Sequence, residues 1–304
     1  MPNWNEIRNE IQEFGNQYDY VRKKYLTRLS ELTERNVIAY YSGFMQKTHL
    51  QESIAITDFD MNGFMATTHR LDKSLGLDLI LHTPGGSPGA IEALVVYLKE
   101  IFNDDIRAIV PQLALSGGTI IACACKSIVM GHHSNLGPID PLFRGLPASA
   151  IVAEFEQAQL EIRNEPNMAF VWDAIISQYF PTLVDQAKKG RDWAHQIVRT
   201  WLTEGMFKGL DESELKGKLD HIIQELGDPE RTLSPDRQFS ATKCKDMGLK
   251  IELLEDNKEL QDEVLSVHHA FMLSLANTPS YKIIQNQNGV LFIQNEEKRP
   301  PPYD

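Results

Sequence analysis

The sequence predicts an α/β fold in which parallel strands are joined by crossover helices. Short apolar strands alternate with helical segments between residues 77 and 130. Two of these strands lead into glycine turns, Pro84-Gly85-Gly86 and Ser116-Gly117-Gly118. Because neighbouring parallel strands end at the same edge of a sheet, we expect both turns to face one crevice.

The first part of the chain predicts a long amphipathic helix followed by two strands and a second helix. Residues 4–35 carry apolar side chains at helical spacing. These are Ile7, Ile11, Phe14, Tyr18, Val21, Tyr25 and Leu29. Residues 37–41 and 53–56 have the composition of strands, and residues 60–75 that of a helix with Asp60 as its N-cap.

The central part supplies the alternation on which the fold class depends. Strands are expected near residues 79–82, 108–110 and 127–130, and helices over residues 90–101 and 120–125.

After Pro141 the pattern is mostly helical and ends in a hairpin. The expected helices span residues 148–163, 169–180, 182–202, 211–226, 241–247 (with Gly248 at its C-terminus) and 261–275. Residues 281–284 and 290–293 flank a turn containing Asn288-Gly289, which predicts the hairpin. The organisation expected is an N-terminal helix (1–35), a main domain (36–250), a C-terminal helix and hairpin (251–295) and a disordered tail (296–304).

Composition narrows the class of protein. The 304 residues are 42% hydrophobic and carry a net charge of −12, which argues against a general nucleic-acid-binding role. Three cysteines form no even framework and no metal-type cluster, so we expect reduced core cysteines and neither a metal nor another cofactor. The first residues lack a signal-peptide pattern, and no apolar run approaches the roughly 20 residues of a membrane span. We therefore expect a cytoplasmic protein.

The two glycine turns together indicate acyl-transfer chemistry. Taken alone, Pro84-Gly85-Gly86 could be a tight turn, and Ser116 could be a helix N-cap. A serine at a strand-to-helix turn exposes its hydroxyl while nearby backbone amides point into the same space, which is the arrangement of a nucleophile beside an oxyanion hole. The pairing of the two turns favours such a site.

Several blocks of this sequence resemble the serine dehydrogenase proteinase family, within the wider ClpP, SppA and crotonase-like superfamily. The matching blocks are Asp78-Leu79-Ile80-Leu81-His82-Thr83-Pro84-Gly85-Gly86, Leu115-Ser116-Gly117-Gly118-Thr119, Ile128-Val129-Met130-Gly131 and Leu136-Gly137-Pro138-Ile139-Asp140-Pro141. The resemblance extends from about residue 37 to residue 249, and includes Asp60-Met61-Asn62-Gly63-Phe64-Met65.

The resemblance implies a spiral of strand-strand-helix units with added helices at both ends. It implies Ser116 as nucleophile and the amides of Gly86 and Gly117 as oxyanion donors. It also implies a peptide or protein substrate and assembly into a homo-oligomer.

The general base is less well defined. Relatives use a Ser-His-Asp triad or a Ser-Lys dyad, and the resemblance points to Asp140 as the acidic member, although an Asp between Ile and Pro can equally form a turn. The family pattern has histidines in the loop before its last short helix, where this sequence has Ser234-Pro235-Asp236-Arg237-Gln238.

Three other side chains are candidate bases. Lys188 falls on the apolar stripe of the helix at 182–202, where partial desolvation would lower its pKa, and His195 lies one heptad further on. The alternative is that Lys188 extends to solvent and His195 is a semi-buried structural residue. His133 precedes Asp140 in a loop, where adjacent histidines are often exposed.

The function expected is that of an ATP-independent serine peptidase acting through an acyl-enzyme at Ser116. Two alternatives stay open. The missing loop histidine suggests an inactive peptide-binding scaffold or sensor of the same fold. A crotonase-like enzyme acting on an acyl thioester would use the two amides to bind an enolate, but it would not require the serine.

Overall fold

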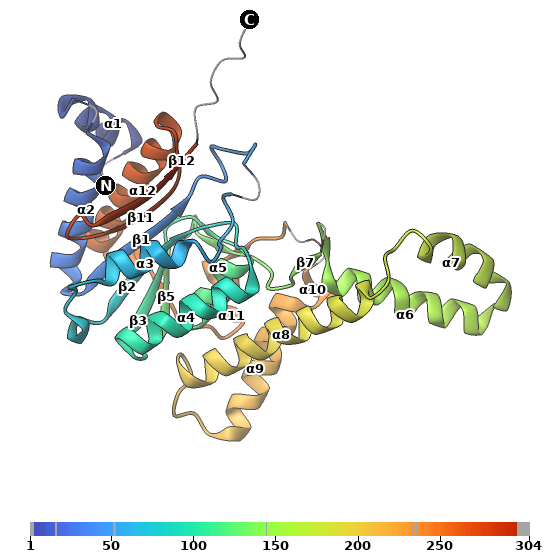
Figure 1. Ribbon diagram of the computed structural model, residues 1–304. Coiled ribbons are helices and arrows are strands. Elements are labelled where there is room, and N and C mark those ends of the chain that lie inside the picture. The colour runs from blue at the N-terminus through green and yellow to red at the C-terminus, as the bar shows by residue number, and fades with distance from the viewer. Residues whose placement is uncertain are drawn as a thin grey trace, which may run out of the picture.

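The computed structural model describes residues 3–15, 17–50, 53–143, 145–232, 234 and 236–296. Its centre is a seven-stranded mixed sheet (Figure 1). In spatial order the strands are β10 (Ile251–Leu253), β5 (Ser127–Met130), β3 (Ile106–Val110), β2 (Leu77–His82), β1 (Asn36–Ser42), β11 (Ser280–Asn286) and β12 (Leu291–Asn295). The first five are parallel, and the C-terminal hairpin adds two antiparallel strands beside β1.

Helices cover both faces of this sheet, as the expected α/β class requires. On one face lie α1 (Trp4–Glu13), α2 (Tyr18–Thr33) and α12 (Lys258–Asn277). The other face is covered by α3 (Asp60–Thr68), α4 (Pro88–Phe102), α5 (Gly117–Cys123), α8 (Leu183–Glu204), α9 (Glu212–Gly227) and α11 (Ala241–Asp246). Every residue of β1 and β2 is buried because both faces are covered.

A second, smaller sheet extends the layer beside α5. It consists of β4 (Leu113–Ala114), β6 (Asn135–Leu136) and β9 (Phe239–Ser240). Strands β4 and β6 are parallel, with Ala114 opposite Leu136. The Thr119 hydroxyl ties α5 to both strands, since it donates to the carbonyls of Ala114 and Gly137 at 2.9 and 3.0 Å.

The segment of the chain between β6 and α8 forms an arm. A short hairpin, β7 (Leu142–Phe143) and β8 (Leu146–Pro147), leads into α6 (Ala148–Asn164) and α7 (Ala169–Ile176). These two helices extend away from the body of the molecule (Figure 1). Phe170 on the arm is 83% exposed. The short helix α10 (Pro229–Thr232) directly follows α9 in the chain.

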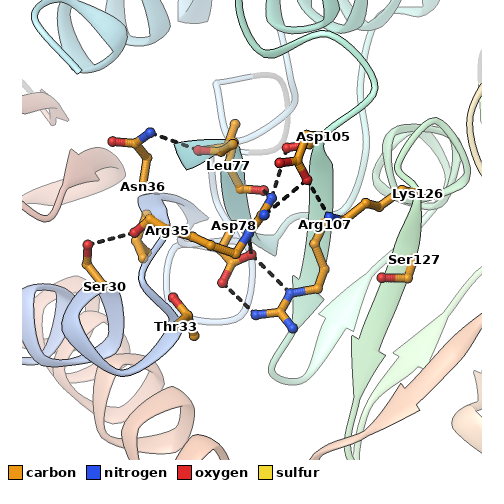
Figure 2. Close-up of polar contacts among 12 residues, drawn as sticks. Ser30, Thr33, Arg35, Asn36, Leu77, Asp78, Asp105, Arg107, Lys126 and Ser127 are labelled. Atoms are coloured by element: carbon orange, nitrogen blue, oxygen red, sulfur yellow. Dashed lines mark hydrogen bonds and ion pairs between the residues drawn. The ribbon is translucent and has the colours of Figure 1, made fainter. Parts of the chain in front are cut away.

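A buried carboxylate cross-links the starts of the central strands (Figure 2). Asp78 of β2 is fully buried and accepts hydrogen bonds from Arg35 Nε at 2.8 Å and Arg107 Nη2 at 2.7 Å. Arg35 also pairs with Asp105, which contacts Lys126. Because the Asp78 carboxylate is paired on both oxygens, its burial is compensated at this end of the sheet.

The structure confirms most of the expected elements. The strand at Ser127–Met130 is found as predicted, and the helices α4, α6, α8, α9, α11 and α12 and the C-terminal hairpin match within a few residues. The three cysteines, Cys123, Cys125 and Cys244, are buried and free, as expected.

Several expectations about element boundaries are wrong, each for a local reason. The single helix over 4–35 is two helices, because the chain leaves the helical conformation near Gly15, where φ is +64°. The helix over 60–75 ends at Thr68, before Arg70 adopts a positive φ. Helix α7 stops at Ile176, and α5 begins at Gly117.

Residues 53–56 do not form a strand, and Asp60 is not an N-cap. Only Ile56 pairs, in an isolated bridge with Gly86. Phe59 holds the N-cap position of α3, and the Asp60 side chain turns into the core. Both differences arise from tertiary contacts of this segment.

The division of the chain at residues 35, 250 and 295 stays a prediction. Residues 297–304, most of the expected tail, lie outside the described residues. Within the described ranges, none of the helices combines the length and apolarity that a membrane crossing requires.

A group of buried rings lies between the sheet and α12. His82, at the end of β2, is fully buried against Tyr41, Phe44 and His268. Neither ring nitrogen of His82 has a hydrogen-bond partner among the described residues. Burial lowers the pKa of His82 to about 3, and burial also lowers the pKa of His268 well below its usual value.

The lowered pKa of His82 predicts that the protein loses stability as the pH falls. Below pH 6.5 the unfolded chain takes up a proton at His82, whereas the folded protein does not until about pH 3. We expect the free energy of unfolding to fall by up to about 1.4 kcal/mol per pH unit for this residue. Urea unfolding between pH 7 and 5 measures the slope, which His82→Leu should reduce. The exposed-site variant His221→Gln should leave it unchanged, and an equal slope for His82→Leu and the parent would contradict the prediction.

Candidate active site

Ser116 occupies a strained turn between β4 and α5. Its backbone has φ 48° and ψ −112°, outside the regions that a non-glycine residue normally adopts. Ser116 holds the N-cap position of α5, but its side chain makes no capping hydrogen bond. The hydroxyl is therefore not used by the helix, and strain of this kind is typical of residues with a functional role.

The two glycine turns lie against each other. A Cβ atom built on Gly85 would lie 2.7 Å from the Gly117 nitrogen and 2.8 Å from the Ser116 Cβ. One built on Gly117 would lie 3.3 Å from the Gly86 nitrogen. Only glycine at position 85 allows this approach, because real Cβ atoms essentially never come within about 3.0 Å of other atoms.

The backbone amides of Gly86 and Gly117 are free to bind an anion. Among the described residues, neither N–H group has a hydrogen-bond acceptor. Gly117 is the first residue of α5, whose N-terminal amides are unpaired within the helix. Two free donors beside a serine hydroxyl can hold the negative charge of an attacked carbonyl.

Asp140 follows β6, which is the neighbour of β4 in the small sheet. Because Ala114 and Leu136 pair in parallel register, the residues that follow them leave the small sheet on the same side. The Asp140 carboxylate is buried and accepts hydrogen bonds from the Ser149 amide, at 3.1 and 3.2 Å, and from the Ser149 hydroxyl. Burial raises the pKa of Asp140, opposed by the Ser149 bonds and the positive charge of Arg191.

His195 lies on a cavity of about 510 Å³ between α6, α8 and α9. The lining includes Ser149, Arg191, His195, Gly227, Asp228 and Glu230. The His195 ring packs against Gly227, and its Nε2 is buried with no hydrogen-bond partner among the described residues. Burial lowers the pKa of His195, and the charge of Arg191 adds to this, so the imidazole is neutral near pH 7.

The structure brings Asp140 and His195 to one region, since Ser149 contacts the first and shares the cavity with the second. The other two candidates, Lys188 and His133, are not among the residues that line this cavity. Lys188 is exposed, and the buried neighbour on the apolar stripe of α8 is Ala187. The His133 side chain is also exposed, and it packs over Gly131.

Sequence reasoning missed one segment that touches the site. The Ile56 amide donates to the Gly85 carbonyl at 2.8 Å, and the Ser87 amide donates to the Ile56 carbonyl at 2.9 Å. A smaller cavity of about 220 Å³, lined by Ile56, Asp60 and Ala90 among others, opens beside it. The only signal for this segment in the sequence was its apolar residues Ile54 and Ile56. The sequence analysis took them as part of a strand over residues 53–56.

The fold and the two turns define a ClpP-like α/β protein with a serine at a strand-to-helix turn. A family model described as "ClpP-like SDH-type serine proteinase" matches residues 15–212, more than half of the chain. The chain belongs to this family, which confirms the resemblance seen in its motifs.

Two relatives come from Methanocaldococcus jannaschii, and both bear the name of an uncharacterized protein. One is 35% identical over 249 residues, which cover 78% of this chain and 75% of the relative. The other is 32% identical over 196 residues, which cover 64% of this chain and 59% of the relative. The names of these two relatives state no activity.

The close approach of the turns predicts opposite effects of alanine at two glycines. Gly85 has φ +100° and no space for a Cβ, so we expect Gly85→Ala to destabilise the protein by about 2–4 kcal/mol. Gly217, inside α9, has nothing within 4 Å of a built Cβ, so Gly217→Ala should stabilise it by up to about 1 kcal/mol. Urea unfolding of both variants measures the difference. A neutral Gly85→Ala would mean that the turns are further apart than described.

Proposed function

We propose that this protein is a serine peptidase that cleaves peptides or unfolded segments without ATP. Ser116 attacks the scissile carbonyl, and the amides of Gly86 and Gly117 stabilise the resulting oxyanion. The observation that carries the proposal is the strained Ser116 turn, which lies against two backbone amides that have no acceptor in the described part of the chain. Membership of a family described as serine proteinases supports it.

The proton of Ser116 passes, in this proposal, to a base in the region of Asp140 and His195. A neutral imidazole with a free nitrogen can accept a proton, and a buried carboxylate of raised pKa can orient or share it. Lys188 is less suited, because an exposed ammonium is not desolvated.

The proposal includes a homo-oligomer in the cytoplasm. The exposed apolar residues of the arm, Leu160, Phe170 and Val171, are suited to contact another copy of the chain. An inactive peptide-binding scaffold of the same fold is the competing function, favoured by the absence of a histidine in residues 234–238 of the sequence.

Replacement of the nucleophile tests the enzyme against the scaffold. We expect Ser116→Ala to abolish covalent labelling by a fluorophosphonate probe, because the probe bonds only to an activated serine oxygen. Intact-mass spectrometry measures the adduct, and Ser177→Ala, at an exposed position, is the matched control. Labelling that survives in Ser116→Ala would refute the nucleophile, and peptide binding without labelling of the parent would support the scaffold.

Replacement of the candidate bases ranks them. We expect Asp140→Asn and His195→Gln each to slow labelling by about 100-fold or more, the usual size of a general-base contribution. The rate is measured at pH 8 and corrected for the folded fraction. A comparable loss in Lys188→Gln or His133→Gln, with His195→Gln unaffected, would move the base to that residue instead.

A further inference from the structure

A buried ion pair joins the C-terminal hairpin to α3. The Nζ of Lys282, on β11, lies 2.9 Å from both carboxylate oxygens of Asp60. Each of the two residues is only 1% exposed. The Asp60 carboxylate also accepts hydrogen bonds from the Tyr40 hydroxyl at 3.1 Å and the Gln294 amide at 2.9 Å. The charge of Asp60 is thus satisfied from three strands of the sheet.

The Lys282–Asp60 pair also forms hydrogen bonds with the backbone on both sides of Ile56. Lys282 Nζ donates to the Ala55 carbonyl at 2.8 Å, and the Thr57 amide donates to Asp60 Oδ2 at 2.9 Å. Ile56 lies between these two contacts. Its position is therefore set by Lys282 on one side and by Asp60 on the other.

Ile56 in turn holds the glycine turn through its own backbone. It donates to the Gly85 carbonyl and accepts from the Ser87 amide, so its two hydrogen bonds bracket Gly86. A Cβ on Gly86 would lie 2.2 Å from the Ile56 carbonyl oxygen, which shows how closely the two backbones approach. The direction of the Gly86 N–H therefore depends on where Ile56 is held.

A buried ion pair contributes little net stability to a fold. Desolvation of two charges often cancels their attraction, and apolar residues of the same size stabilise a core as well or better. The Lys282–Asp60 pair does something that apolar residues could not do, since it supplies donors and acceptors to a backbone segment that no strand pairs.

We infer that Lys282 and Asp60 are positioning residues that act through Ile56 to orient the Gly86 amide for the oxyanion. The inference rests on the proposed peptidase function and deepens it. Lys282 lies outside residues 15–212, so the C-terminal hairpin supplies a part of the site that the family-matched region does not contain.

The test compares two buried pairs at opposite ends of the sheet. We expect Lys282→Gln to lower the second-order rate of fluorophosphonate labelling at Ser116 by about 10–100-fold, less than the loss of a whole oxyanion donor. The matched control is Arg107→Gln, which disrupts the Asp78 pairing at the start of β2 (Figure 2) and should leave the rate per folded molecule unchanged. Lys282→Arg should recover part of the rate.

Amide hydrogen exchange gives a readout that does not depend on activity. The Ile56 and Ser87 amides should exchange at least about 10-fold faster in Lys282→Gln than in the parent, because their mutual bridge with the glycine turn is loosened. In Arg107→Gln both amides should keep their protection relative to global stability. If Lys282→Gln does not fold, the double variant Lys282→Met with Asp60→Leu removes both charges together and carries the same expectations.

The outcomes distinguish the proposed peptidase function from the positioning role of Lys282 and Asp60. A parent protein that the probe does not label would refute the proposed function, and the exchange result would still decide whether the pair holds the turn. A labelled parent whose Lys282 variants react at the same rate, or show unchanged exchange at Ile56 and Ser87, would refute the positioning role and leave the peptidase intact.

Discussion

The close contact between two backbone turns is the constraint on which the site depends. The turn at Gly85 and Gly86 meets the turn at Ser116 and Gly117 so closely that no Cβ fits between them. This contact requires glycine at position 85, and Ser116 beside it has a positive φ. It also leaves two amides without acceptors among the described residues, next to a hydroxyl that the helix does not use. The arrangement is built before any substrate arrives, which is what electrostatic stabilisation of an oxyanion requires.

The sheets supply the rigidity that this contact needs. One turn follows β2 in the large sheet and the other follows β4 in the small sheet, and Thr119 binds α5 to β4 and β6. Buried charges are found at both ends of the central strands. Asp78 pairs with Arg35 and Arg107 at their starts (Figure 2), and the Lys282–Asp60 pair lies near the glycine turn at the other end.

Burial has opposite effects on the pKa values of the two candidate ionisable groups, Asp140 and His195. It raises the pKa of the Asp140 carboxyl and lowers that of the His195 imidazole, because in each case the charged form loses its hydration. The two shifts bring an acid and a base toward the same pH range. Such convergence suits proton transfer, although burial also lowers the pKa of a packed structural residue such as His82.

The sequence by itself determined the fold class, the order of most elements and the two glycine turns. Apolar strands that are buried on both faces read as continuous apolar runs, and the glycine pairs that follow two of the strands can be read directly from the sequence, so these signals are local. The alternation between residues 77 and 130 and the pair Gly86 and Ser116 therefore could be recognised without coordinates.

The tertiary structure alone decided the contacts between segments far apart in the chain. Nothing local in residues 53–60 reveals that Ile56 bridges to Gly86 or that Asp60 turns inward to meet Lys282, 222 residues away. The solvent exposure of Lys188 was likewise set by which face of α8 the neighbouring helices cover, because an amphipathic stripe gives a direction but not the depth of each side chain. These contacts and exposures depend on long-range packing, which no local residue pattern encodes by itself.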